Sequence, residues 1–160
     1  MRFIALFLLL GLPCDLLAAS SNSGLPIPRF VSLKNAETNV RTGPGTRYPI
    51  HWVYRREGMP VEVIEEYDLW RKIRDAEGTA GWVHKAMLEG KRNAMIIGKE
   101  PQMVRIDSNS KSKAILKAEP NVIVQMLECE PEWCRMQISG RKGWIEKKNL
   151  WGVYKKEIFD

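Results

Sequence analysis

The chain contains an internal repeat, and this feature restricts the possible folds more than any single motif does. A first unit is marked by a Val-Arg pair, a Trp 29 residues after that Arg, and a Gly-Trp pair whose Trp comes 12 residues later: Val40-Arg41, Trp70 and Gly81-Trp82. A second unit has the same marks at spacings of 28 and 11 residues: Val104-Arg105, Trp133 and Gly143-Trp144. Each unit spans about 60 residues, so the sequence indicates a tandem duplication joined at residues 89–93.

Short strand-like runs separated by turn residues fill both units, and the apolar spacing typical of helices is missing. The expected strands form a three-strand meander in each unit: 60–63, 70–74 and 79–84 in the first, then 121–128, 133–138 and 143–146 in the second. The sequence therefore predicts an all-β fold of two small barrels in tandem.

The N-terminus has the features of a secretory signal peptide. Arg2 supplies a positive charge, residues 3–12 are almost entirely apolar, and small residues at 18–20 suit a signal peptidase. The apolar run is shorter than the roughly 20 residues that a membrane-spanning helix needs, and no later segment approaches that length. We therefore expect residues 1–20 to be removed, leaving an exported protein without a transmembrane segment, in the periplasm or at the cell surface.

The chain has a net charge of +6, which signal removal does not change because Arg2 and Asp15 leave together. Excess positive charge favours anionic partners such as cell-wall carboxylates, envelope phosphates or lipid headgroups. Nucleic acid would also suit the charge, but export disfavours it as a partner.

Two cysteines, Cys129 and Cys134, lie in the part of the chain that is expected to remain after processing. In an oxidising compartment such a pair usually forms a disulfide, which here would close the turn at residues 130–132. A reactive thiol pair or a metal site is the alternative, but redox motifs use closer spacing and no histidine lies nearby in the sequence. We expect a structural disulfide, no bound metal and no cofactor.

The first unit opens with Asn-Val-Arg-Thr-Gly-Pro-Gly-Thr at residues 39–46. It continues with four further motifs: Tyr48-Pro49-Ile50, a turn at Gly58, Trp70 and Gly81-Trp82-Val83-His84. With these motifs, residues 36–88 resemble the bacterial SH3-like (SH3b) domain family. The second unit resembles the family through its Val-Arg, Trp and Gly-Trp-Ile motifs and its strand pattern only, because the Gly-Pro-Gly loop is absent.

The resemblance implies a barrel of five to six strands, a module often attached to cell-wall enzymes and used to bind peptidoglycan peptides or other proteins. It implies no catalytic activity. The expected organisation is a signal peptide at 1–20, a first SH3-like barrel at 30–90, a degenerate second barrel at 94–152 and a tail at 153–160. The tail could dock Ile158 and Phe159 on a barrel or on a partner.

A candidate binding groove is predicted in the first barrel. Trp82 and His84 share one face of a strand, which leaves Val83 for the core. Three aromatic residues follow the Gly-Pro-Gly loop, where they could form an apolar floor or simply pack in the core. The arginine of the first Val-Arg pair could pair with a ligand carboxylate, although bracing the loop is favoured. The candidate residues are Arg41, Tyr48, Trp52, Tyr54, Trp82 and His84.

Strand parity also separates Trp70 from Ile73 and Trp133 from Met136, since side chains three apart on a regular strand face opposite sides. We expect Ile73 and Met136 inside, and each Trp either as a plug at the barrel edge or as a ligand-stacking surface. Glu62, Glu65 and Glu66 are interpreted as the solvated face and edge of a strand.

These features predict an exported, non-enzymatic binding module that recognises cell-wall peptide through the first barrel. No segment remains to house a Cys-His hydrolase, because both histidines lie in the first unit and the two cysteines are expected to be oxidised. The alternative is an envelope scaffold that binds another protein, or an accessory factor for a separate cell-wall hydrolase.

Overall fold

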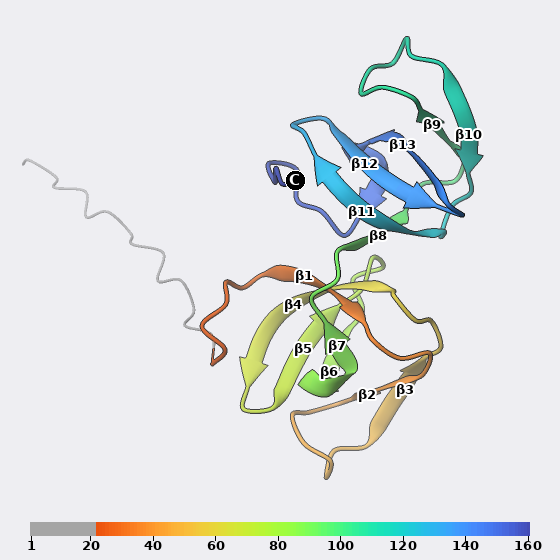
Figure 1. Cartoon of the computed structure of the whole chain (residues 1–160). Helices are drawn as coiled ribbons and strands as arrows, with labels where there is room; N and C mark the ends of the chain where they lie inside the picture. Colours follow the sequence, from red (N-terminus) through yellow and green to blue (C-terminus); the bar gives the residue numbers. More distant parts are fainter. Residues whose placement is uncertain (1–21) are drawn as a thin grey trace, which may run out of the picture.

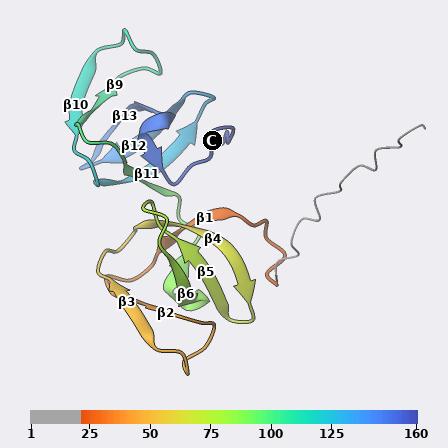
Figure 2. The same ribbon diagram turned by 180° about the vertical axis from the view of Figure 1, so that it is seen from behind.

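The computed structural model describes residues 22–160 as two all-β units stacked one above the other (Figures 1 and 2). The predicted signal peptide at 1–20 lies outside the described residues. Within the described part there is no α-helix, and no helix is long and apolar enough to cross a membrane. The prediction of an all-β fold with two small tandem barrels is confirmed.

The first barrel is an antiparallel sheet of seven strands in the order β3-β2-β6-β5-β4-β1-β7. Its elements are β1 (Arg29–Leu33), β2 (Thr38–Arg41), β3 (Ile50–Tyr54), β4 (Pro60–Tyr67), β5 (Trp70–Arg74), β6 (Ala80–His84), the 3-10 turn η1 (Lys85–Met87) and β7 (Leu88–Glu89). Strands β4, β5 and β6 form the expected meander, with Val63 opposite Ile73 and Ile73 opposite Gly81.

The second barrel repeats this topology in the order β10-β9-β13-β12-β11-β8-β14. Its elements are β8 (Asn93–Ile96), β9 (Gln102–Arg105), β10 (Ala114–Ala118), β11 (Ile123–Cys129), β12 (Trp133–Ile138), β13 (Arg141–Glu146), the 3-10 turn η2 (Lys147–Asn149) and β14 (Leu150–Trp151). The two hairpins β2-β3 and β9-β10 project at opposite ends of the molecule (Figure 2).

Each barrel has its own core, and the residues that strand parity predicted to face inward are buried in it. Ile73 and Val83 are fully buried in the first core, and Met136 is fully buried in the second. Strands β5 and β12 alternate without interruption, so Trp70 and Trp133 lie on the outer face instead of entering a core through a bulge. The bulge that the β4-β5 pair does contain lies between Val63 and Glu65.

The repeated Val-Arg and Gly-Trp motifs meet where two strands cross at close range. A Cβ atom on Gly81 would lie 2.5 Å from Cγ1 of Val40, and one on Gly143 would lie 2.5 Å from Cγ1 of Val104. Real Cβ atoms do not approach other atoms so closely, so only glycine allows β6 and β13 to pass over these valines. The internal repeat therefore records a packing requirement that occurs once in each barrel.

Different interactions hold the strand ends together in the two barrels, at the β4-β5 turn of the first and the β11-β12 turn of the second. In the first, Glu66 lies opposite Arg71 and receives contacts from Arg29 at 2.7 Å and Arg71 at 3.1 Å. In the second, Cys129 lies opposite Cys134, and the two form the predicted disulfide. An ion cluster and a covalent bond thus occupy corresponding positions.

The expectation that Glu62 and Glu66 are solvated is wrong, although Glu65 is exposed as expected. Glu62 is only 4% exposed and accepts hydrogen bonds from Arg74. Burial alone would raise the pKa of Glu66, but hydrogen bonds from Ser23 and Arg29 and the charge of Arg71 outweigh it and lower that pKa. The bulge between Val63 and Glu65 turns Glu66 onto the face that Arg71 shares with Ile73, where the N-terminal segment covers it. Glu62 stays on the outer face but is covered by Tyr154 of the tail, which parity could not reveal.

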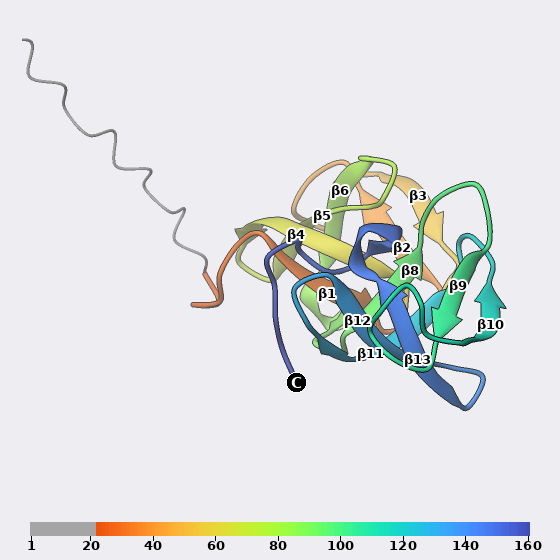
Figure 3. The same ribbon diagram turned by 90° about the horizontal axis from the view of Figure 1, so that it is seen from above.

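An aromatic cluster joins the two barrels. The Phe30 ring of β1 lies 5.0 Å from the Trp151 ring, edge-on, and 4.7 Å from the Tyr154 ring, centroid to centroid. Hydrogen bonds surround this cluster: Trp151 Nε1 donates to the Pro60 carbonyl at 3.1 Å, and the Tyr154 hydroxyl donates to Glu62 Oε1 at 2.9 Å. In the view from above, the second barrel lies over β1 and β4 of the first (Figure 3).

The C-terminal tail docks on the second barrel. Phe159 forms an antiparallel bridge with Cys129, with hydrogen bonds in both directions between the backbone amides and carbonyls. Ile158, the other residue expected to dock, is 64% exposed. The tail therefore extends the edge of β11 beyond the residues that pair with β8.

Candidate functional site

A groove of about 250 Å³ lies on the outer face of the first barrel. It is built where β2, β5 and β6 present their outward side chains, and it is completed by the loop after β2 and by η1. The lining residues are Glu37, Asn39, Arg41, Thr46, Trp70, His84 and Met87.

Trp70 and His84 form one wall of the groove. They lie opposite each other on β5 and β6, with ring centroids 5.5 Å apart and ring planes at 86°. His84 Nδ1 accepts a hydrogen bond of 3.2 Å from the Ala86 amide, so the neutral imidazole carries its proton on Nε2. Nε2 has no hydrogen-bond partner among residues 22–160 and can donate to a ligand.

Arg41 braces the loop that borders the groove. Its Nη1 donates to the carbonyls of Tyr48 at 2.7 Å and Thr46 at 3.2 Å, which is the bracing role that the sequence favoured. Nη2 and Nε make no hydrogen bond within the described part of the chain, so the same guanidinium still has donors for a carboxylate. One side chain can thus shape the loop and contact a ligand.

Polar acceptors line the groove as well. Asn39 is exposed, and the exposed carboxylate of Glu37 pairs only loosely with Arg55, at 3.7 Å. An exposed pair of this kind contributes little to stability and exchanges easily with solvent or ligand. The groove therefore combines donors, Arg41 and His84, with acceptors and with the indole of Trp70.

The six residues that the sequence proposed for a groove do not all lie together in the structure. Arg41 and His84 line the same groove, whereas Trp82 is only 8% exposed and lies in the sheet between Arg41 and Lys72. Little of the Trp82 ring is left for a ligand. Tyr48 packs on the Gly-Pro-Gly loop, because a Cβ on Gly43 would come within 2.5 Å of its ring.

Trp52 and Tyr54 pack against the core of the first barrel. The Tyr54 hydroxyl donates to Asp75 Oδ2 at 2.7 Å, and burial together with this hydrogen bond raises the pKa of Tyr54. These two aromatic residues therefore pack against the core, which is the alternative that the sequence left open.

Five of the seven groove residues were not among those proposed from the sequence. Trp70 was recognised as an outer-face residue, but its position beside His84 depends on the register between β5 and β6. The other four carry no motif of their own, being ordinary residues of a strand, a loop and a 3-10 turn: Glu37, Asn39, Thr46 and Met87.

The second barrel has a smaller counterpart of this groove. Trp133 lies opposite Glu146, as Trp70 lies opposite His84, and Glu146 forms an ion pair with Lys148. The hollow beside them measures about 140 Å³. Arg105 still braces its loop, through a 2.7 Å hydrogen bond to the Ser112 carbonyl. The second site is therefore largely satisfied by its own side chains.

No cluster of three or more metal-ligating side chains occurs in residues 22–160. The buried carboxylates of Glu62 and Glu66 are each bonded to arginine, and the cysteines are joined in a disulfide. The chemistry that the groove offers is hydrogen bonding, charge pairing and aromatic contact, which are means of recognition.

Comparison with known proteins assigns both units to one family. The family described as bacterial SH3 domain matches residues 34–90 and residues 98–152. No curated protein matches the chain.

Solved structures show a remote likeness. NlpC2 from Trichomonas vaginalis is 13% identical with a TM-score of 0.37, over 81% of this chain and 50% of that chain. NlpC1 from the same organism is 13% identical with a TM-score of 0.36, over 85% and 49%. An NlpC/P60 family protein from Bacillus cereus ATCC 10987 is 14% identical with a TM-score of 0.34, over 76% and 55%. The chain spans about half the length of these proteins, and the low TM-scores leave the family match as the informative one.

Proposed function

Because the chain belongs to the bacterial SH3 domain family, we propose that it is an exported, non-enzymatic binding module whose first barrel takes up a cell-wall peptide. The groove between Trp70, His84 and Arg41 is the proposed binding site. The observation that carries this proposal is the pairing of Trp70 with His84 on the outer face, beside an arginine with unused donors.

The chemistry of the groove suits a peptide with both charges. A ligand carboxylate would accept hydrogen bonds from Arg41 and from Nε2 of His84, while an ammonium or amide would donate to Glu37 or Asn39. The indole of Trp70 would cover an aliphatic portion of the ligand. Cell-wall peptides carry carboxylates, amines and small aliphatic side chains, which makes them a fitting class of ligand in the compartment expected from the signal peptide.

Sedimentation with insoluble peptidoglycan sacculi tests the proposal directly. The protein from Ser21 onward is mixed with sacculi at low and high salt, and the bound fraction is measured. Trp70→Ala should weaken binding about tenfold or more, as expected for loss of a central aromatic contact. Trp133→Ala is the matched control, because it removes the corresponding indole from the self-paired site of the second barrel and should leave binding unchanged.

Other outcomes of the sedimentation experiment would contradict binding in the first groove. Equal loss in both Trp variants would place binding outside the first groove, and binding that disappears at high salt in the unchanged protein would reduce it to general basic charge. If sacculi do not bind at all, the envelope scaffold or hydrolase accessory role becomes the better hypothesis. Circular dichroism of each variant verifies that the fold is intact.

A further inference from the structure

A second concave site lies on the second barrel, next to its Trp133 hollow, with which it shares Glu132 and Lys148. It measures about 320 Å³ and is formed by the β11-β12 turn, η2, β14 and the start of the tail. Three of its seven residues are lysines, one is a glutamate, and the others are apolar: Pro131, Glu132, Lys147, Lys148, Leu150, Val153 and Lys155. The site thus combines excess positive charge with an apolar surface.

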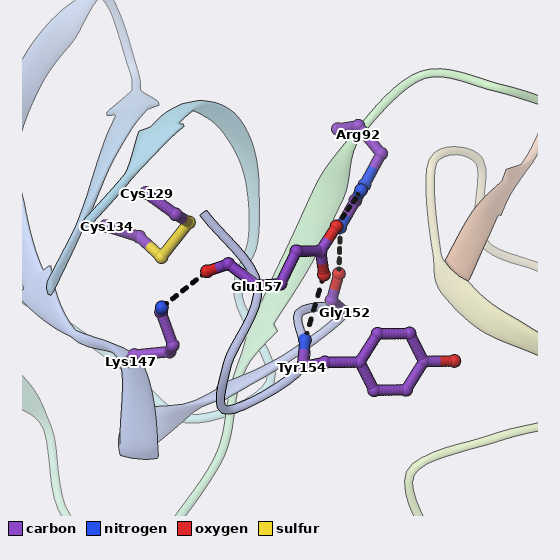
Figure 4. The surroundings of a disulfide bond; sticks show 7 residues. All are labelled: Arg92, Cys129, Cys134, Lys147, Gly152, Tyr154 and Glu157. Carbon is purple, nitrogen blue, oxygen red and sulfur yellow. Dashed lines mark hydrogen bonds and ion pairs between the residues drawn. A yellow bond between two sulfur atoms is a disulfide. The ribbon is translucent and has the colours of Figure 1, made fainter. Parts of the chain in front are cut away.

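Lys147 is the unusual member of this site, because it is only 6% exposed. Its ammonium donates one hydrogen bond of 2.7 Å, to the backbone carbonyl of Glu157 (Figure 4). The other two N–H groups have no hydrogen-bond partner in the described residues. A buried ammonium with unused donors is costly unless an acceptor satisfies it, and Lys147 is one of the residues that line the pocket.

The carboxylate of Glu157, whose backbone carbonyl accepts the Lys147 hydrogen bond, is engaged by other groups. One oxygen of Glu157 pairs with Arg92, and the other accepts a hydrogen bond of 3.0 Å from the Tyr154 amide (Figure 4). Burial would raise the pKa of Glu157, but the hydrogen bonds from Arg92 and the Tyr154 amide and the charges of Arg92 and Lys147 lower it below the usual value. Lys148 pairs with Glu146, whereas Lys147 and Lys155 form no direct ion pair in residues 22–160, and Lys147 acts on Glu157 only through its charge.

In the corresponding region of the first barrel, two of the cations have a carboxylate partner. The hollow beside Lys85 and Leu88, which correspond to Lys147 and Leu150, also contains the cations Arg29 and Arg71. Both arginines contact the carboxylate of Glu66. In the second barrel the place of that acid is taken by Cys129 of the disulfide. The carboxylate of the tail residue Glu157 pairs with Arg92 instead, and it interacts with Lys147 only through charge, without a direct ion pair.

We propose that this pocket, the tail pocket, binds a small organic anion through Lys147 and Lys155, with the aliphatic part of the ligand against Leu150, Val153 and Pro131. The anionic group is a carboxylate or a phosphate monoester, since lysine pairs with either as a point charge. The volume is near the lower limit for ligand pockets and fits a fragment about the size of one amino-acid residue.

Nuclear magnetic resonance titration of the 15N-labelled protein, from Ser21 onward, tests this site. N-acetylleucine should give saturable shifts at the amides of Leu150, Val153 and Lys155, with a Kd of about 1–10 mM for so small a ligand. N-acetylleucine amide, which has the same shape without the charge, should bind at least about tenfold more weakly.

Two further probes distinguish the sources of the anionic group. Isobutyl phosphate replaces the carboxylate by a phosphate monoester, and inorganic phosphate lacks the aliphatic part. If isobutyl phosphate binds tighter than N-acetylleucine, the site selects phosphate esters; if it binds more weakly, the site selects carboxylates. Inorganic phosphate should bind at least about tenfold more weakly than the better of the two, because it cannot use the apolar wall.

Matched lysine variants complete the test. Lys155→Ala should weaken binding about fivefold, whereas Lys156→Ala, the adjacent exposed lysine outside the pocket, should change it less than about twofold. Lys147→Met should abolish binding, and Lys155→Ala keeps the test valid if that variant does not fold. Equal effects of Lys155→Ala and Lys156→Ala, equal binding of the amide probe, or shifts elsewhere in the spectrum would each overturn the proposal. Absence of saturable shifts up to about 50 mM would do the same.

Discussion

Phe30 is expected to couple the unfolding of the two barrels. It belongs to β1 of the first barrel, yet it is absent from the first core, and its ring contacts are with Trp151 of β14 in the second barrel and with Tyr154 in the tail. The side chain is 8% exposed. Phe30→Ala should therefore remove energy mainly from the contact between the barrels and much less from either core.

The magnitude follows from the geometry of the cluster. Truncating a buried phenylalanine costs about 3–5 kcal/mol in total. The two ring contacts, at 5.0 and 4.7 Å, should each contribute about 0.5–1.5 kcal/mol of that loss. The part due to Trp151 should vanish when Trp151 is already alanine. A double-mutant cycle of Phe30→Ala and Trp151→Ala should therefore give a coupling of about 0.5–1.5 kcal/mol.

Denaturation by urea, followed by tryptophan fluorescence and by calorimetry, supplies the four free energies of unfolding. The unchanged protein should unfold in one transition, and Phe30→Ala should broaden or split it, because each barrel retains its own core. A coupling below about 0.3 kcal/mol would mean that the two sites act independently and would refute the reasoning. Val31→Ala, on the neighbouring position of β1 that packs on the first core, serves as the control and should show no coupling to Trp151.

Three further results are expected. Replacing both Cys129 and Cys134 by serine should lower the free energy of unfolding by about 2 kcal/mol, the entropy expected for so short a loop, and reductant should reproduce this in the unchanged protein. Gly81→Ala should cost about 1–3 kcal/mol through its clash with the first core, whereas Gly90→Ala, with no atom within 4 Å of the new Cβ, should be nearly neutral in the same urea titration. Because the folded-state pKa of Glu66 is lowered, its stabilisation is present above the normal glutamate pKa of about 4.3 and is lost as pH falls through the lowered value, so Glu66→Gln should flatten the acid limb of a stability-against-pH curve.

The candidate site was only partly predictable from sequence. The alternation of side chains along a strand placed Trp70 and His84 outside and Ile73 and Val83 inside, and these assignments depend on local geometry alone. Alternation does not say which outer residues lie side by side, because that depends on the register between strands. The Trp70-His84 wall therefore became visible only with the pairing of β5 and β6.

Coverage of the outer face was the other property that the sequence could not supply. Trp82 has the same parity as His84, but it is nearly buried. Glu62 has the pattern of a solvated strand residue, yet it is covered by Arg74 of its own barrel and by Tyr154 of the C-terminal tail. Residues that cover an outer face come from distant parts of the chain, so no local pattern reports them.

By itself the sequence determined the two-barrel organisation, the disulfide and the core positions, since these depend on repeats, on cysteine spacing and on a period of two along each strand. The tertiary structure alone decided which outer residues form the groove, how Phe30, Trp151 and Tyr154 join the barrels, and that Lys147 is buried beside the tail. The reason is physical: local patterns specify the direction of a side chain, whereas its neighbours are set by the packing of segments that lie far apart in the chain.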